Sequence, residues 1–511
     1  MSTKMGFWRW ALACAAVLIA TGPAGAFVID PTGVSTDEPT ALVLYPRLKV
    51  DTNTCEAMTP GGAKFCSLTP TVPCTSNSDC NGCNTTLDTC RLNPSITCDS
   101  DSECPGAGVD TIVQLTNTSE FLTKVHCFYT NANSHCSNAP TTICTDENFR
   151  NVCPTGGLCV PGWVENDFHL TLTKRQPISW SVNTGLPQLP LATKPGMGTP
   201  PQFNDGNIPA VSEVPFTGEL LCIEVDVSTE LPSDRNDFKG EATTIKTILS
   251  EIDANKYNAI GIKAIEGAMD DNPGVLNIGG PNAEYGVFDD QVNPPRFAGC
   301  PNVLTVDHFF DGANVVTHDN ELAGRVRSEL TIVPCQRDYL HQTANGNITT
   351  IQFLIFNEFE QRFSTSTKLN CYKQVRLSDI DTQPGVAQDS FSIFSVGVQG
   401  TLTGMSRLRS VAGPDPNMTG YDGRTILAVL SENWDSGVCS PPLAMGSGAG
   451  SAERQLCSSD ADCPAGQTCN LAGPVTPPVP CSEPSCTSTT TANVQFQGSR
   501  EEGDQITIPL P

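Results

Sequence analysis

Hydrophobic and polar residues alternate along several short stretches of the chain. Phe168, Leu170 and Leu172 are each separated by one polar residue, and the same spacing recurs in residues 221–227 and 394–398. Successive side chains of a β-strand point to opposite faces, so a period of two predicts strands with one buried face. We therefore expect strands at these three places and an all-β fold of two-layer sheets.

Two halves of the chain carry similar strands in the same order. DTIVQLTNTSEFLTKVHCFY, which begins at Asp110, resembles TTIQFLIFNEFEQRFSTSTKLNCY, which begins at Thr349. ALVLYPRL, DFHLTLT and GELLCIEV in the first half match SELTIVPCQ, DSFSIFSVGV and GRTILAVL in the second. The shared order predicts two related Ig-like β-sandwich domains.

Cysteine-rich stretches account for the difference in length between the halves. Pro46 and Thr111 are 65 positions apart, whereas the matching Pro334 and Thr350 are 16 apart, and the eight-cysteine stretch 55–104 fills the excess. Loops tolerate such insertions because a longer loop costs little additional closure entropy. The cysteine-rich stretches are therefore predicted to be loop insertions that disulfides hold in shape.

The expected layout combines the two sandwiches, their insertions and a leader. It consists of a signal peptide at 1–26; a first β-sandwich at 27–232 with cysteine-rich insertions at 55–104 and 136–160 and a Pro-rich loop at 186–215; a β-rich middle segment at 233–330; and a second β-sandwich at 331–511 with a cysteine-rich insertion at 439–486. The last strands, ANVQFQG and GDQITIPLP, are expected to return to the second sandwich.

The first residues predict export. Lys4 and Arg9 precede the ten-residue apolar run ALACAAVLIA, and Ala24-Gly25-Ala26 offers small residues for cleavage. This is the pattern of a secretory signal peptide, and the run is too short for a membrane span. We expect cleavage near Ala26 and a mature chain that is secreted, held at the cell surface or located in the periplasm. Glycosylation sequons occur at Asn84, Asn117, Asn347 and Asn417.

Charge and composition restrict the partners. The chain has 55 acidic and 29 basic residues, a net charge of −26, and only 16% charged residues. This balance disfavours nucleic acid and anionic lipid surfaces as partners. No second stretch is long and apolar enough for a membrane span, so the expected partner is a protein or a glycan at the cell surface.

The cysteines of an exported chain predict disulfides. The groups within 55–104, 136–160 and 439–486 are even in number, so each can close internally. Apart from Cys14 in the predicted signal peptide, five cysteines lie scattered elsewhere. We expect the bridges Cys335–Cys371 and Cys127–Cys222, the second on the outer surface because Cys222 alternates with apolar residues. Cys457, Cys463 and Cys469 form the expected framework of the third insertion.

One polar cluster is a candidate metal or proton-transfer site. Its possible ligands are Asp307, His308, Asp311, His318 and Asp319, with Glu321 close by. Imidazole and carboxylate groups bind metals or relay protons, which would suit a hydrolase. The alternative is a polar loop beside the aromatic pair Phe309 and Phe310, which would be buried.

A second candidate site has the spacing of a calcium loop. Asp99, Asp101 and Glu103 place carboxylates at alternate positions, which could converge on a hard cation. A glycine turn and a distal bidentate glutamate are lacking, so this is not an EF-hand. The alternative is a solvated turn. No cofactor is expected from the sequence as a whole, with calcium as the possible exception.

The cysteine-rich stretches share a motif with known families. CTSNSDC, CDSDSEC and CSSDADC each hold five residues between cysteines, and the third continues to CSSDADCPAGQTC. This C-x5-C-x5-C pattern is similar to the N-terminal cysteine-rich region of the Dickkopf family, and it implies a disulfide-bonded mini-fold without an activity. Together with KGEATTI, YNAIGI, CPNVLTVDHFFDG and NEFEQRFS, the layout resembles a family of exported bacterial β-rich proteins to which no activity is assigned.

Three functions remain open from the sequence. The first is a non-catalytic secreted or cell-surface protein with a structural or binding role, since function on repeated β-sandwiches resides mainly in loops. The second is a secreted metal-dependent hydrolase centred on 307–321. The third is a calcium- or glycan-binding module.

Overall fold

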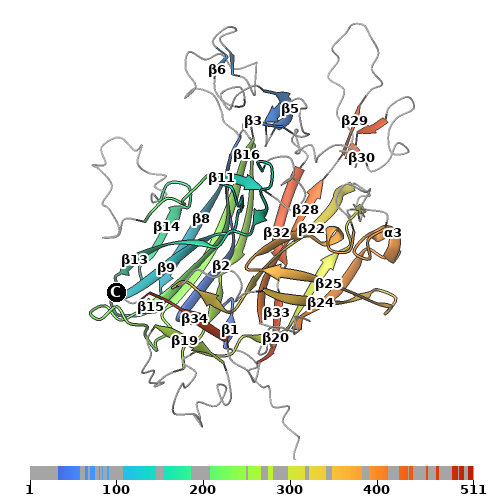
Figure 1. Ribbon diagram of the computed structural model, residues 1–511. Helices are drawn as coiled ribbons and strands as arrows, with labels where there is room; N and C mark the ends of the chain where they lie inside the picture. The colour runs from blue at the N-terminus through green and yellow to red at the C-terminus, as the bar shows by residue number, and fades with distance from the viewer. Residues whose placement is uncertain are drawn as a thin grey trace, which may run out of the picture.

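The protein is all-β, with 3-10 and α-helical turns of only three and four residues in the described part. The computed structural model describes residues 33–53, 108–144, 153–185, 208–248, 251–265, 274–279, 297–312, 322–340, 348–382, 391–411, 425–435, 494–499 and 504–509, together with short strands and single residues within 55–90, 314–316 and 437–492. The strands gather into two main units, which lie side by side in Figure 1.

The first unit is a ten-stranded sheet with the order β13-β9-β15-β2-β8-β16-β17 along its main path. Its strands are β1 (Val34–Ser35), β2 (Leu42–Thr52), β8 (Gly108–Asn117), β9 (Thr123–Asn131), β13 (Val164–Leu172), β14 (Pro177–Ser181), β15 (Phe216–Val225), β16 (Phe238–Ile248), β17 (Glu251–Asn258) and β18 (Ile260–Ile262). The sheet folds at β2, which pairs with β15 and β18 along most of its length and with β8 at its last two residues.

Aromatic residues fill the space between the two layers of the first unit. Trp180 on β14 donates its indole N–H to the Tyr129 hydroxyl on β9 at 2.6 Å, and it meets Phe168 on β13 edge to face. Alternation on β8 is regular, with every second side chain buried. The residues of β8 that alternate in the sequence therefore alternate between the interior and the outer face of this unit.

The second unit is a pair of facing sheets with the orders β25-β24-β27-β20-β33 and β21-β22-β28-β32, with β26 also paired to β22. Their strands are β20 (Pro301–Phe309), β24 (Ile348–Asn357), β25 (Arg362–Asn370), β27 (Thr403–Val411) and β33 (Val494–Ser499) in one, and β21 (Asn314–Val316), β22 (Leu322–Pro334), β26 (Lys373–Arg376), β28 (Ile426–Asp435) and β32 (Cys486–Ala492) in the other. Leu304, Ile332, Phe353, Leu408 and Leu430 are among the residues of their common core.

A small third sheet joins the two units. It consists of β19 (Val275–Ile278), β34 (Asp504–Thr507) and β23 (Arg337–Asp338). Ile506 on β34 belongs to the same hydrophobic cluster as Tyr339, which follows β23, and Phe128 on β9. Of the two last strands of the chain, β33 joins the second unit as the sequence predicted, whereas β34 lies in this connecting sheet.

The middle segment 233–330 contributes strands to both units. Its first strands, β16, β17 and β18, pair within the first unit, and β20, β21 and the first part of β22 belong to the second. The boundaries of the two proposed domains and their Ig-like character stay predictions.

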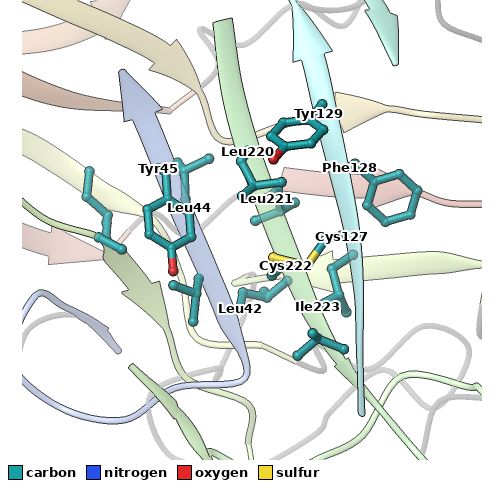
Figure 2. Packing of buried hydrophobic residues seen from close by; sticks show 14 of the residues in the cluster. Leu42, Leu44, Tyr45, Cys127, Phe128, Tyr129, Leu220, Leu221, Cys222 and Ile223 are labelled. Carbon is teal, nitrogen blue, oxygen red and sulfur yellow. A yellow bond between two sulfur atoms is a disulfide. The ribbon is translucent and has the colours of Figure 1, made fainter. Parts of the chain in front are cut away.

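The Cys127–Cys222 bridge is present, but the expectation that it lies on the outer surface is wrong. The two residues face each other on β9 and β15, and both are fully buried (Figure 2). They lie on the face that carries Tyr129 and Leu220, inside the sandwich, while the second unit covers the opposite face of β15. The bridge thus joins neighbouring strands of one layer, whereas the bridge of antibody domains joins two sheets.

The other scattered bridge differs from the prediction. Cys335 is bonded to Cys300, which precedes β20, and its partner is not Cys371. Cys371 is fully buried after β25, where the backbone takes the left-handed conformation with φ of 63°. The sequence offered no way to choose between these partners, because the choice depends on how β20 approaches the end of β22.

The four-cysteine insertion closes internally, as predicted. Cys136 pairs with Cys153 and Cys144 with Cys159, around the small sheet of β10 (Ser134–Cys136), β11 (Ala139–Cys144) and β12 (Cys159–Val160). The described strands of the other insertions are β3 (Cys55–Ala57), β4 (Lys64–Cys66), β5 (Thr69–Pro73), β6 (Cys83–Asn84), β7 (Thr89–Cys90), β29 (Gly437–Ser440), β30 (Leu456–Cys457) and β31 (Thr468–Asn470).

The strand expected at 394–398 is instead a turn followed by the short helix α3 (Val396–Gln399). The Ser395 hydroxyl donates to the carbonyl of Ser392 at 2.7 Å, and Gly400 ends the helix with φ of 70°. Serine side chains that bond to nearby backbone groups compete with strand pairing, so the alternation of FSVGV was misleading. A 3-10 turn, η5 (Leu377–Asp379), follows β26.

Candidate ligand-binding face

The predicted cluster at 307–321 does not converge on one point in its described part. Asp307 is exposed on β20, whereas its neighbour His308 is 3% exposed, because successive residues of a strand point to opposite faces. Asp311 follows β20 and is fully buried. His318 and Asp319 lie outside the described residues, as does Glu321, so their part of the prediction is untested.

His308 belongs to the core of the second unit. Its Nε2 lies 2.8 Å from the Ser406 hydroxyl, and its ring meets Phe310 edge to face. Burial lowers the pKa of His308 to about 4, so the imidazole is neutral at pH 7. Phe310 is fully buried as the alternative interpretation expected, whereas Phe309 is only half-buried. Phe310 packs so close to Gly404 that a Cβ there would lie 2.4 Å from its ring.

Asp311 holds three chain segments together. One carboxylate oxygen accepts the backbone N–H of Ser328 at 2.7 Å. The other accepts the Arg376 guanidinium at 3.0 Å and the backbone N–H of Ser378 at 3.1 Å. Burial raises the pKa of Asp311, and Arg376 opposes that shift. Protein donors thus surround both oxygens, which describes a structural carboxylate better than a metal ligand.

The remaining candidate sites stay predictions. Asp99, Asp101, Glu103 and Cys463 lie outside the described residues. Cys457 and Cys469 lie on β30 and β31, which both pair with β29. Among the described residues, the sulfur atoms of Cys136, Cys144 and Cys153 lie close enough together to hold a metal ion. All three sulfurs form disulfides instead.

Two histidines that the sequence left scattered lie together on the first unit. His126 on β9 and His169 on β13 are stacked with ring centroids 4.0 Å apart, and His126 Nε2 lies 2.7 Å from an Asp167 oxygen. Glu230 is shared between His169, 3.6 Å away, and the ammonium of Lys124. Burial is the main cause that lowers the pKa of both histidines. The register of β9 and β13 creates this cluster, and sequence spacing alone could not show it.

The outer face of the sheet β25-β24-β27-β20-β33, here called the open face, presents aligned rows of side chains. In the central row, Ser364, Leu354 and Arg407 lie opposite one another on three adjacent strands, and the buried Thr305 continues the row on β20. Their neighbours along each strand, such as Ser406 and Leu408 beside Arg407, are buried in the core. Alternation thus assigns one set of residues to the core and the other to this face.

Basic residues concentrate on the open face. Arg407 and Arg409 on β27, Arg362 on β25 and Lys368 farther along β25 are all exposed. No carboxylate in the described part of the chain lies within ion-pair distance of these four residues, whereas Arg175 on the first unit has Glu120 beside it. Arg409 donates its Nε–H to the Gln352 side chain at 2.8 Å. Such a concentration is notable in a chain with a net charge of −26.

Two hollows lie along β27, one on the open face and one at the end of the sheet, where Glu432 of β28 in the facing sheet contributes to the lining. The basic hollow has a volume of about 400 Å³ and is lined by Arg362, Arg407 and Arg409, with Leu354 and Val303 among the apolar residues. The acidic hollow has a volume of about 470 Å³, and its lining includes Asp307, Glu358, Glu432, Phe356 and Met405. Apolar linings with a few placed polar groups are typical of ligand sites.

The sequence contained a partial signal for the open face. The alternation in GMSRLRSV places Arg407 and Arg409 on one side of a strand. It could not show that Arg362, from the next hairpin, comes to the same hollow, because this depends on the registers of β24 with β25 and of β24 with β27. Of the residues singled out from the sequence, Asp307 is exposed on this face, and His308 also lines the acidic hollow.

Comparisons with known proteins give little resemblance. A family model described as the gill-associated viral 3C-like peptidase matches residues 242–373, about a quarter of the chain. No curated protein matches. A chain of the human norovirus GI.7 Houston strain virus-like particle aligns over 78% of this chain and 84% of its own, with 9% identity and a TM-score of 0.10, which does not indicate a shared fold. Within the described residues, no helix has the length and apolarity needed to cross a bilayer.

Proposed function

We propose that this chain is a non-catalytic secreted or cell-surface binding protein whose ligand occupies the open face. The observation that carries the proposal is the set of arginines at the basic hollow, which have no carboxylate partners in the described part of the chain. Polar side chains and half-buried apolar side chains alternate with them in register, so the face offers both charge and contact area.

The unit that carries the open face is attached to the first unit by buried contacts, which suits a preorganised binding surface. The two units are joined by a buried ion pair between Glu219 and Arg337 and by stacking of Phe128 on Tyr339 with ring centroids 4.5 Å apart. A preorganised surface loses less entropy when a ligand binds. Disulfides in both units are consistent with an oxidising location outside the cytoplasm, which supports secretion.

A hydrolase function receives less support from the described residues. Nucleophilic catalysis needs a nucleophile and a base that substrate can reach. Ser406 and His308 form such a hydrogen-bonded pair, but both are nearly completely buried. Within the stretch matched by the peptidase model, Cys300 and Cys335 are joined in a disulfide and Cys371 is buried. The untested residues His318 and Asp319 are the remaining basis for a metal-dependent hydrolase.

The proposal is tested with a broad array of neutral and charged glycans, probed with the full mature chain and a variant of the open face. Leu354→Glu and Met405→Glu together place two carboxylates at half-buried positions of the two hollows. Val164→Glu, at a 53% exposed position of the first unit, is the matched control.

We expect at least one ligand to bind the wild type and the control but not the face variant. Binding that survives in the face variant would assign the ligand to another surface. The absence of binding across the array would contradict a glycan-binding role for the face.

A further inference from the structure

We infer that the ligand of the open face is an acidic polysaccharide, a linear glycan whose sugar residues carry carboxylates. The inference rests on the proposed function and names the class of ligand. It starts from the charges of the two hollows, which differ in sign although β27 contributes to both.

The basic hollow suits carboxylates. Arginine binds a carboxylate through two parallel hydrogen bonds, and a guanidinium that lacks a protein carboxylate is available for one in a ligand. Arg407 and Arg409 are two residues apart on β27, so their backbone positions are about 7 Å apart on the same face. Arg362 approaches the same hollow from β25, across Phe356 and Leu354. The arginines therefore form a spaced set that can contact successive charges of an extended chain.

Apolar residues between the charged groups suit sugar rings. Leu354 and Val303 line the basic hollow, and Phe356 and Met405 line the acidic one. A sugar ring has apolar C–H faces and a polar rim of hydroxyl groups, so it can cover such side chains while its rim bonds to their polar neighbours. Gln352 and Ser364 provide amide and hydroxyl groups beside the arginines.

The acidic hollow suits the hydroxyl groups of a glycan. Asp307 and Glu358 are exposed there, and Glu358 already accepts the backbone N–H and hydroxyl of Thr403 at 2.9 and 2.8 Å. Carboxylates accept hydrogen bonds from sugar hydroxyls but repel phosphates. A DNA strand has no free hydroxyl groups along its length, whereas each sugar of the glycan carries hydroxyl groups beside its carboxylate and can turn them toward these side chains.

The length of the face also suits a polymer. From Thr403 to Arg409, β27 runs past both hollows, a distance of about 20 Å at the rise of a β-strand. A single sugar or a lone carboxylate would fill a fraction of this length. An extended chain can contact both hollows together and gain from several weak contacts.

The test uses polygalacturonate and its fully methyl-esterified form, which share a backbone and differ in the charge of the carboxyl group. The full mature chain is compared with Arg407→Gln/Arg409→Gln, which removes two charges and keeps hydrogen-bonding groups. Arg175→Gln, at a 72% exposed side chain of the first unit, is the matched control. An unchanged far-UV circular dichroism spectrum and unfolding midpoint confirm that each variant is folded.

We expect polygalacturonate to bind the wild type and Arg175→Gln equally, and to bind the double variant at least tenfold more weakly. Affinity should fall with added salt, since exposed charges are screened. Tighter binding of the esterified polymer, lost in the Leu354→Glu/Met405→Glu variant, would overturn the inference and leave the proposed function standing. Tighter binding of poly-aspartate or single-stranded DNA would overturn it in favour of another class of partner. Equal binding by the double variant, or no binding of polygalacturonate, would also overturn it.

Discussion

Arg337 and Glu219 form a two-point ion pair across the contact between the two units. Nε of Arg337 donates to Oε1 of Glu219 at 2.7 Å, and Nη2 donates to Oε2 at 2.8 Å. A third donor, Nη1, bonds to the carbonyl of Cys335 at 3.0 Å. Both side chains are at most 1% exposed, and Glu219 lies on β15 while Arg337 lies on β23. The pair therefore depends on the two units keeping their relative position.

Removal of one partner of this pair should destabilise the protein strongly. Arg337→Met leaves the Glu219 carboxylate buried without its cation, which we expect to cost about 3–5 kcal/mol of unfolding free energy. The double variant Glu219→Met/Arg337→Met should recover part of that loss, because no charge remains buried. Urea unfolding of the wild type, both single variants and the double variant measures the coupling. A loss below 1 kcal/mol for Arg337→Met would place the pair among solvent-screened surface bridges.

His308 should make the protein sensitive to acid. Its pKa in the folded state is about 4, below the ordinary value of 6.5, so the unfolded chain takes up the proton first as the pH falls. Stability from this residue is complete at pH 7 and declines from pH 6.5 downward, by about 2–3 kcal/mol at pH 4.5. Urea unfolding at pH 7 and 4.5 should show a smaller pH effect in His308→Gln than in the wild type.

Ser406→Ala separates the titration of His308 from its hydrogen bond. This variant removes the hydroxyl beside Nε2 and should lower stability by about 1 kcal/mol at both pH values. It keeps the imidazole, so the difference between pH 7 and 4.5 should persist. An equal pH effect in the wild type and His308→Gln would show that other groups cause the acid sensitivity.

The sequence predicted the positions of the strands better than it predicted which of their faces are buried. Alternation identified β13, whose interior face is as expected, and the second half of β15, where it correctly predicted that Leu221 and Ile223 are buried. It did not show that Cys222 and Glu224, on the other face of β15, are also buried. Both faces of β15 are covered by residues that are far away in the chain, and local periodicity contains no information about such contacts.

Prediction of the candidate sites from the sequence was limited in the same way, by contacts between residues that are far apart in the chain. The stretch DHFFDG correctly indicated a buried Phe310. Its His308 and Asp311 are also buried, and they bond to Ser406 and Arg376 respectively. The partners come from β27 and β26, so spacing within 307–321 could not distinguish a metal site from a structural one. The open face was missed for the related reason that its arginines come from separate strands.

Two buried asparagines should hold equivalent turns in the two units. Asn117 lies at the end of β8, and its side-chain N–H groups donate to the backbone carbonyls of Phe121 and Thr173 at 2.7 and 2.9 Å. Its side-chain oxygen accepts the backbone N–H of Ser119. Asn357, at the end of β24, accepts the N–H of Gln361 at 3.0 Å and donates its amide N–H to the Gln361 side-chain oxygen at 3.0 Å. The two residues occupy matching places in the similar stretches of sequence.

Loss of the amide donors should destabilise both turns. Asn117→Asp cannot donate to the two carbonyls, so we expect a loss of about 2–3 kcal/mol at pH 7, and a smaller loss for Asn357→Asp. Asn370→Asp, at an exposed position on β25, is the control and should change stability by less than about 0.5 kcal/mol. Thermal unfolding measures all three.

Since Asn117 is fully buried, its sequon should stay unmodified in the folded chain even in a glycosylating host, and a glycan found there by mass spectrometry would contradict this packing.

Reduction should affect the inserted cysteines before the core bridge. Cys136–Cys153 and Cys144–Cys159 hold three short strands, and Cys159 is partly exposed, whereas Cys127–Cys222 is fully buried between β9 and β15. At low concentrations of reductant we expect alkylation of the four inserted cysteines while the far-UV β signal persists. Cys127→Ala/Cys222→Ala should lower the global unfolding free energy by about 2–5 kcal/mol, since this bridge closes a loop with a separation of 95 residues. Cys136→Ala/Cys153→Ala should leave the main transition nearly unchanged. If alkylation of all six cysteines coincided with loss of the β signal, the insertion would be an integral part of the first unit.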